Sequence, residues 1–253
     1  VAAVTGQLKT LGHISNFFAS EPQIRLAERL SAAAGGGRVF LANSGAEANE
    51  AAFKLSRLTG WTRLVAMEGS FHGRTMGALA VTHTEKYRKP FEPLPGEVTF
   101  VPFGDAGALE ATVYETVAAV VVEPVQGGSG VIPAPEGYLA AAREITSRTG
   151  TLLWIDEVQG VTADLVTVAK GLGNGFPIGA CIATGRAADL LTPGGHGSTF
   201  GGNSVAAAAG NAVLDVLGSG LLEDVRRVGD WLASEITGLG CPGITGVRGS
   251  GLL

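Results

Sequence analysis

Apolar and polar positions follow two distinct patterns along this chain. Short apolar runs, of the length of strands buried on both faces, occur at Arg63 to Met67, Ala118 to Val122, Thr151 to Ile155, Leu165 to Ala169 and Ile178 to Ala183. The helical period occupies Pro22 to Ala34, Ala46 to Leu58, Gly137 to Thr149, Ser204 to Leu217 and Leu222 to Leu239. Strands that alternate with helices predict an α/β fold with a mostly parallel central sheet covered by helices on both faces.

The spacing of two predicted strands is too short for a parallel pair. The strand that runs into Ile155-Asp156-Glu157-Val158 is followed closely by the strand Leu165 to Ala169. A crossover between parallel strands needs about a dozen residues or more. The pattern therefore predicts either an antiparallel hairpin or a missing segment near Gln159-Gly160, and we favour the missing segment.

Composition and charge narrow the class of protein. The chain has 253 residues, of which 45% are hydrophobic and 16% charged, which is typical of a globular enzyme with one large domain or two small ones. The net charge of −5, without a basic run longer than a pair, argues against nucleic acid or a membrane as partner. The two cysteines have neither disulfide-framework nor metal-site spacing, and no apolar run reaches membrane-spanning length. We expect a cytoplasmic protein without a metal.

The segment Asn43 to Glu50 predicts a helix start that can bind an anion. Ser44 and Glu47 have the spacing of a capping box, and apolar positions follow at the helical period. The amides of Gly45 and Ala46 then have no backbone partner, and such amides bind phosphate groups. Taken alone, the segment is more typical of an ordinary capped helix.

Two apolar strands end in ionisable residues. The first ends in Asp156-Glu157, where an aspartate can stay ionised beside a cationic ring nitrogen. A metal-binding carboxylate pair of a nucleotide hydrolase is the alternative, but the upstream run Gly35 to Gly37 lacks the lysine of a phosphate-binding loop. The second strand ends in Lys170, whose pKa we expect desolvation to lower, leaving an amine able to attack a carbonyl.

Two loops add further candidates. One loop places Phe71, His72 and Arg74 in a single turn, where the ring could stack on a flat cofactor and the guanidinium could bind a carboxylate. We interpret His72 as a structural histidine. The glycine-rich loop Gly194 to Asn203 carries Ser198 and Thr199 and could supply a second phosphate contact.

These segments occur together in the order typical of one enzyme family. The matching runs are SNFFASEP from Ser15, NSGAEANEAAFKLSR from Asn43, GSFHGRTMGALA from Gly69, VEPVQG from Val122, IDEVQ from Ile155, AKGLGNGFPIGA from Ala169, HGSTFGGN from His196 and VRGSGLL from Val247. In this combination the chain resembles the class III (subgroup II) aminotransferases, which have the fold type I of enzymes that depend on pyridoxal 5'-phosphate (PLP). The resemblance covers essentially the whole chain and implies PLP as cofactor.

The resemblance also implies roles for individual residues. Lys170 matches the lysine that binds PLP covalently, and Asp156 the carboxylate on the pyridine nitrogen. The other expected cofactor contacts are Ser44, Gly45, Ala46 and Thr199 around the phosphate, Phe71 and Val158 on the ring, Gln159 at the phenolic oxygen, and Glu157. Arg74 matches the arginine that binds the substrate α-carboxylate, and Ser198 a further substrate contact. Ser198 and Thr199 are expected to serve the other subunit of a homodimer.

The expected reaction follows from the same likeness. The nearest members transfer an amino group from N2-acetylornithine to 2-oxoglutarate in arginine biosynthesis; ornithine, succinylornithine and 4-aminobutyrate remain alternatives, as do a same-fold aminomutase and a non-catalytic PLP-binding protein. The chain departs from the family at Gly128, where relatives have a glutamate that restrains a second arginine. We expect residues 1–34 to be a remnant of an N-terminal segment, residues 35–217 the large PLP-binding domain, and residues 218–253 the start of a truncated C-terminal domain.

Overall fold

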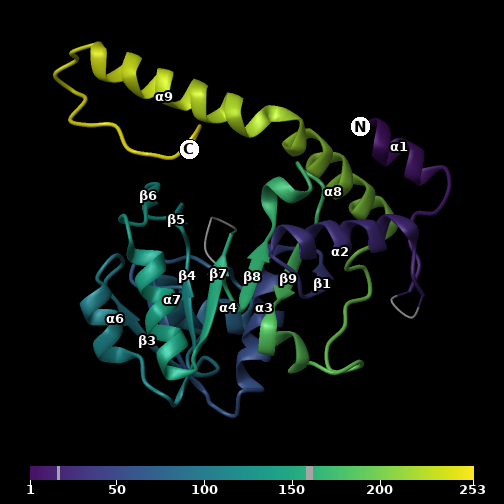
Figure 1. Cartoon of the computed structure of the whole chain (residues 1–253), viewed down its shortest axis with the longest axis horizontal. Helices are drawn as coiled ribbons and strands as arrows, with labels where there is room; N and C mark the ends of the chain where they lie inside the picture. The colour runs from purple at the N-terminus through teal and green to yellow at the C-terminus, as the bar shows by residue number, and fades with distance from the viewer. Residues whose placement is uncertain (16–17, 158–161) are drawn as a thin grey trace.

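A seven-stranded sheet forms the centre of the molecule (Figure 1). The computed structural model describes residues 1–15, 18–157 and 162–253. The strand order is β1-β9-β8-β7-β4-β2-β3, and within the described residues only β9 runs antiparallel to its neighbours. The strands are β1 (Arg38–Ala42), β2 (Arg63–Met67), β3 (Glu97–Val101), β4 (Val117–Val122), β7 (Leu152–Asp156), β8 (Leu165–Val168) and β9 (Gly179–Ala183), with a separate small pair β5 (Val125–Gln126) and β6 (Ile132–Pro133).

Helices cover both faces of this sheet. The α-helices are α1 (Ala2–Leu8), α2 (Glu21–Ala33), α3 (Gly45–Arg57), α4 (Met76–Ala80), α5 (Glu85–Arg88), α6 (Ala106–Thr112), α7 (Tyr138–Thr149), α8 (Ser204–Val216) and α9 (Leu222–Gly238). Short turns of helix are η1 (Lys89–Phe91), η2 (Lys170–Leu172), η3 (Gly185–Asp189) and η4 (Leu217–Leu221). The expected α/β class with a mostly parallel sheet is confirmed.

Two apolar cores lie on opposite faces of the sheet. Alternate residues of each central strand point to opposite faces, as the pleat requires: in β7, Leu153 packs in one core and Trp154 in the other. The first core buries residues of α2, α6, α7 and α8, and the second buries residues of α3 and α4. Because β4 and β7 are covered on both faces, their sequences are continuous apolar runs rather than alternating ones.

The five predicted strands and five predicted helices all occur, with ends that differ by at most one residue. Two strands of the sheet, β1 and β3, were not predicted. β3 is an edge strand with exposed positions at Glu97 and Thr99, so it lacks a continuous apolar run. β1 directly precedes the capped helix and is a short run after three glycines.

The connection between β7 and β8 settles one of the two alternatives for that region. The strands pair in parallel, with Trp154 opposite Leu165 and Asp156 opposite Thr167, so an antiparallel hairpin is wrong. The connecting residues 157–164 are fewer than the dozen usual for a parallel crossover. The predicted break at Gln159-Gly160 lies outside the described residues.

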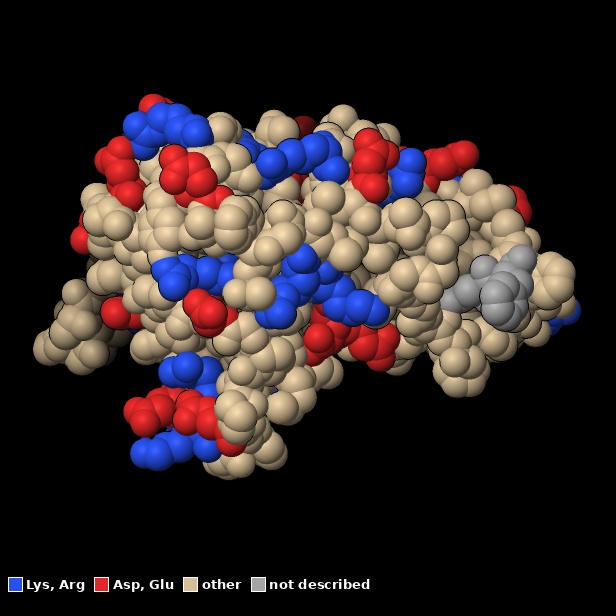
Figure 2. Space-filling model, turned by 90° about the horizontal axis from the view of Figure 1, so that it is seen from below, with Lys and Arg blue, Asp and Glu red and all other residues tan. Residues whose placement is uncertain are grey.

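Helix α9 extends away from the sheet as an arm that continues from α8 (Figure 1). The run Ser204–Gly238 joins α8, η4 and α9, and its most apolar window has a mean hydropathy of 1.5, enough by length and composition to cross a membrane. The expectation of two separate helices is confirmed, because Ser219 and Gly220 have non-helical backbone angles that kink the run between α8 and α9. A third of this window (33%) is buried inside the molecule, and Ala206 and Ala207 of α8 belong to the apolar core. Figure 2 shows basic and acidic side chains intermingled over one face of the molecule.

Candidate active site

The sheet brings the predicted site residues to one edge. Because β1, β8, β7, β4 and β2 all run in the same direction, the residues that follow them lie along the same edge. The order of these residues along the edge follows the strand order: Ser44, Lys170, Asp156, Glu123 and the loop of Phe71. The carboxyl ends of strands are the usual ligand-binding edge of an α/β sheet.

Asp156 is held by three hydrogen-bond donors. Its Oδ2 accepts from His72 Nδ1 at 2.8 Å and from Asn49 Nδ2 at 3.0 Å, and its Oδ1 accepts from Thr167 Oγ1 at 2.8 Å. The side chain is 13% exposed. The donors come from α3, from the loop after β2 and from β8, so three elements fix the orientation of one carboxylate.

His72 is buried, as a structural histidine would be, but it contacts the candidate catalytic carboxylate. Burial lowers the pKa of His72, while the hydrogen bond and charge of Asp156 and the charge of Glu123 raise it, and the net direction is upward. Nε2 of His72 has no hydrogen-bond partner among the described residues. The neighbouring carboxylates therefore favour the cationic form of this imidazole more than that of a free histidine.

Lys170 differs from the expectation of a desolvated, neutral amine. Its side chain is 81% exposed and forms an ion pair with Glu157. Partial burial lowers the pKa of Lys170, but the hydrogen bond and charge of Glu157, with the charges of Asp156 and Glu123, raise it above its ordinary value. The predicted lowering is wrong because three neighbouring carboxylates outweigh desolvation. Both Lys170 and Glu157 have positive φ angles, 44° and 77°, which non-glycine residues adopt rarely and mostly at functional sites.

The start of α3 lies beside the segment that carries Lys170 and could bind an anion. Ser44 caps the helix by accepting from the amide of Glu47 at 3.2 Å, and the carboxylate of Glu47 accepts from the amide of Asn43 at 2.9 Å. Gly45 lies against Ala169, where an added Cβ would be 3.1 Å from the Ala169 side chain. A side chain at position 45 would crowd Ala169, so glycine fits best there. Because Lys170 directly follows Ala169, the first amides of α3 lie close to Lys170.

Glu123 and Asn49 are site residues that the sequence interpretation missed. Glu123 follows β4 directly, and its Oε2 accepts from the amide of Phe71 at 3.0 Å. Burial raises its pKa to about 7. Like Asp156, Glu123 is a carboxylate at the end of an apolar run, so the same sequence pattern could have identified it. Asn49 is a buried polar residue on the apolar face of α3, which is itself unusual enough to indicate a role.

Phe71 and Arg74 both lie at the open side of the site. The Phe71 ring is 37% exposed, and the Cζ atom of Arg74 lies 5.6 Å from its centre. At Gly128 an added Cβ would be 3.4 Å from Cβ of Phe71. A glutamate at this position would therefore start directly beside the ring, and this chain leaves that space open.

The remaining predicted residues divide into two groups. Ser198 lies near the start of α3, where Asn43 Nδ2 donates to its Oγ at 3.1 Å, and Thr199 beside it is exposed. Val158 and Gln159 lie outside the described residues. The structure therefore brings Ser44, Gly45, Ala46, Phe71, Asp156, Glu157 and Lys170 to one edge, with Arg74 at its rim.

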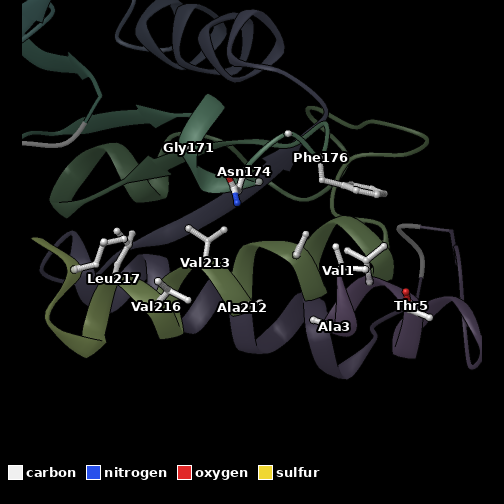
Figure 3. Close-up of a pocket in the computed structure, with 15 residues that line it drawn as sticks. Val1, Ala3, Thr5, Gly171, Asn174, Phe176, Ala212, Val213, Val216 and Leu217 are labelled. Atoms are coloured by element: carbon white, nitrogen blue, oxygen red, sulfur yellow. The ribbon is translucent and has the colours of Figure 1, made fainter. Parts of the chain in front are cut away.

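A large apolar groove lies away from these polar groups (Figure 3). It has a volume of about 690 Å³ and lies between α1, α8 and the turn after Lys170. Figure 3 shows Val213 of α8 directed toward the turn that carries Asn174, with Leu217 of η4 further along the groove. Its lining has no ionisable side chain, so it lacks the chemistry found at the strand ends.

Known proteins similar to this chain extend beyond its length. The acetylornithine aminotransferase of Mycobacterium tuberculosis is 57% identical over 272 residues, and the match covers 100% of this chain and 68% of that protein. The aligned stretch is 19 residues longer than this chain (272 − 253). This difference agrees with a segment that relatives have and this chain lacks.

Solved structures and the family model give the same assignment. The ornithine aminotransferase of Toxoplasma gondii, whose crystal structure shows partial occupancy of PLP at the active site, has a TM-score of 0.93 at 31% identity, covering 100% of this chain and 67% of that one. The N-acetylornithine aminotransferase of Stenotrophomonas maltophilia has a TM-score of 0.81 at 35% identity, covering 99% and 68%. The model of the aminotransferase class-III family matches residues 1–253. The chain belongs to the class-III aminotransferases.

Proposed function

We propose that this aminotransferase uses PLP to transfer the terminal amino group of N2-acetylornithine to 2-oxoglutarate, a reaction of arginine biosynthesis. One observation carries the proposal: Asp156, Lys170 and the open amides of α3 lie at one edge of the sheet. The identity of 57% to an acetylornithine aminotransferase supports the choice of amino donor.

The residues at this edge fit the chemical groups of PLP. A pyridinium nitrogen needs a carboxylate partner, and three donors hold the Asp156 carboxylate in place. A phosphate needs backbone donors, and the start of α3 offers the amides of Gly45 and Ala46 without a side chain in front of Gly45. A carbonyl needs an amine, which Lys170 provides. Phe71 offers a partly exposed ring face.

Each residue then has a distinct task. When bound, PLP draws electrons from the carbon that carries the substrate amine. Asp156 would hold a proton at the ring nitrogen, and His72 keeps Asp156 in place through the contact at 2.8 Å. Lys170 binds the cofactor, and after the substrate displaces it, its Nζ can move a proton as base and then acid. For this task Lys170 must leave Glu157, and its exposed side chain leaves it room to do so.

Arg74 is the proposed ligand of the substrate α-carboxylate. Its side chain is exposed at the rim and has no ion pair among the described residues. A guanidinium binds a carboxylate through two parallel hydrogen bonds. Ornithine, succinylornithine and 4-aminobutyrate also carry a carboxylate. Which of these amino donors is preferred would depend in part on the space left open at Gly128. Ser198 is a proposed second substrate contact.

We further propose that the protein acts as a cytoplasmic homodimer in which Ser198 and Thr199 reach the site of the partner. The exposed loop around them supports this, since Phe200 is 58% exposed next to Thr199. Residues 35–217 would form the PLP-binding domain. Light scattering of the purified protein would test the dimer; Phe200→Asp should shift it toward monomer if this loop is at the interface.

The test of the proposed function uses purified protein and matched amino donors. N2-acetylornithine, ornithine, succinylornithine and 4-aminobutyrate are each supplied with 2-oxoglutarate, and glutamate formation is measured. We expect the highest kcat/KM with N2-acetylornithine. Turnover without a 2-oxo acid would instead indicate an aminomutase, and bound PLP without turnover of any donor would indicate a non-catalytic protein.

Lys170→Ala gives the largest expected effect of any substitution. It removes the amine that binds the cofactor and moves the proton, so turnover should fall below detection and the visible absorbance of covalently bound PLP should disappear. Arg57→Ala, an exposed residue at the end of α3, is the matched control and should retain both. An active Lys170→Ala protein would refute the assignment.

A further inference from the structure

Arg74 lies in contact with the aromatic ring of Tyr87. The Cζ atom of Arg74 is 3.6 Å from the centre of that ring, well inside the distance of a cation–π interaction. Tyr87 belongs to α5, and its ring meets the ring of Phe71 edge to face at 6.3 Å. The guanidinium therefore touches one ring closely and lies near a second.

The short distance fixes how the guanidinium meets Tyr87. Each guanidinium nitrogen lies about 1.3 Å from Cζ, so an edge-on approach would push a nitrogen into the ring. Only face-to-face stacking is compatible with 3.6 Å. Stacking leaves the N–H groups at the guanidinium edge free, and these are the groups that bind a carboxylate through two hydrogen bonds.

Apart from the Phe71 ring, whose centre lies 5.6 Å from Cζ, no other described contact holds the Arg74 guanidinium. Its side chain has neither an ion pair nor a hydrogen bond in the described parts of the chain, and it is exposed. An exposed arginine side chain otherwise samples many rotamers, and a ligand must select one of them. Tyr87 thus provides the principal restraint on the position of this cation.

We propose that Tyr87 is a positioning residue that stacks on Arg74 and orients its guanidinium edge toward the carboxylate of the amino donor. This inference rests on the proposed function, because it takes Arg74 as the carboxylate ligand. Tyr87 itself acts through its ring face, so its hydroxyl group is dispensable. It thereby contributes to the preference for amino donors that carry a carboxylate.

Two amino donors separate this role from a general structural role. N2-acetylornithine carries the carboxylate, and N-acetyl-1,4-diaminobutane is the same molecule without it. In Tyr87→Leu we expect KM for N2-acetylornithine to rise about three- to ten-fold with kcat nearly unchanged, the range of an exposed to partly desolvated cation–π contact. The kinetic constants for N-acetyl-1,4-diaminobutane should stay within about two-fold of wild type.

Two further variants serve as controls. Tyr87→Phe keeps the ring face and should restore most of the wild-type KM. Lys86→Met removes the neighbouring cation, whose Nζ lies 5.3 Å from the same ring, and should leave both donors unaffected. Equal losses for the two donors in Tyr87→Leu, or a Tyr87→Phe protein as impaired as Tyr87→Leu, would overturn the proposal.

A second readout does not depend on activity. The Nε–Hε signal of Arg74, assigned in NMR spectra with an Arg74→Lys variant, should be shifted upfield by the ring of Tyr87. The shift should persist in Tyr87→Phe and be lost in Tyr87→Leu. An unshifted wild-type signal would refute the stacking even if N2-acetylornithine is a substrate. If the stacking is present but no donor is turned over, the proposed function fails and the contact stands.

Discussion

The ends of two neighbouring strands, β7 and β8, carry the two main ionisable residues of the site in opposite ways. Asp156 is 13% exposed and accepts three hydrogen bonds from three elements. Lys170 is 81% exposed, is paired with Glu157, and has a backbone φ of 44°. The two strands are paired directly in the sheet, so the difference does not come from their location.

This difference matches what each residue is proposed to do. A carboxylate that holds a proton on a ring nitrogen keeps one charge state and one position throughout a reaction. An amine that first binds a cofactor and then moves a proton must change both its charge and its partner. The first task requires a rigid set of donors, and the second requires a side chain with an exposed path and a single partner to leave.

The substitution Asp156→Asn tests the role of the rigidly held carboxylate and has the largest expected effect of those that follow. The amide has the same shape and can still accept from Thr167, but it cannot hold a positive charge on a ring nitrogen. We expect kcat to fall by about 10²- to 10³-fold, the range for removal of one electrostatic contact in a site. The pKa of His72 should fall as well, because the charge that raises it is lost; NMR titration of the imidazole would show this. A variant with near-normal kcat would contradict the role given to Asp156.

Glu123, at the end of the neighbouring strand β4, is a third ionisable residue of the site and differs from both Asp156 and Lys170. Burial raises its pKa to about 7, so the folded protein binds this proton more tightly than the unfolded chain, whose glutamate has a pKa near 4.5. Stability should therefore decrease as the pH rises from about 4.5 to about 7. Glu123→Gln removes the buried charge and should stabilise the cofactor-free protein at pH 8 by on the order of 2–3 kcal/mol.

Urea unfolding of wild type and Glu123→Gln at pH 8 and pH 5 measures this effect. The two proteins should differ less at pH 5, where the wild-type carboxyl is protonated in the folded state. A Glu123→Gln protein that is less stable than wild type at pH 8 would show that the carboxylate is compensated by its neighbours rather than costly.

The smallest expected effect concerns the partner of Lys170. Glu157→Gln removes the charge that contributes most to the raised pKa of Lys170, so that pKa should fall and more of the amine should be neutral near pH 7.5. PLP added to the cofactor-free protein should then bind covalently about three- to ten-fold faster, as followed by absorbance, since each unit of pKa changes the neutral fraction about ten-fold. The gain should shrink as the pH rises toward the pKa of Lys170. The control is Glu85→Gln, which removes an exposed carboxylate paired with Lys89 and should leave the rate unchanged. A Glu157→Gln protein that binds PLP more slowly would contradict the view that Glu157 keeps Lys170 protonated.

The sequence was sufficient to predict the sheet class and the strand ends that form the site. The apolar runs before Asp156 and Lys170 reveal where the two buried strands end, whatever the rest of the fold does. The direction of the Lys170 pKa could not be predicted in this way, because it depends on three carboxylates from β4 and β7 whose proximity is set by strand order.

The network around Asp156 was also beyond reach of the sequence. Thr167 contacts Asp156 because the two are partners in the register of β7 and β8, and His72 contacts it because the loop after β2 crosses β4 to reach it. The structural interpretation of His72 rested on residue type alone. Register and strand order are long-range properties, and no local pattern contains them.

Helix α3 connects the two ends at which a bound substrate and cofactor would be held. Its first turn carries the open amides at Gly45, and one turn later Glu50 accepts hydrogen bonds from the amides of Gly77 and Ala78, at 2.7 and 3.2 Å, just beyond the loop of Arg74. A single helix thus sets the distance between the amides proposed to bind the phosphate and the loop proposed to bind the substrate carboxylate. Any displacement of α3 would therefore move the open amides at Gly45 and the segment after Arg74 together.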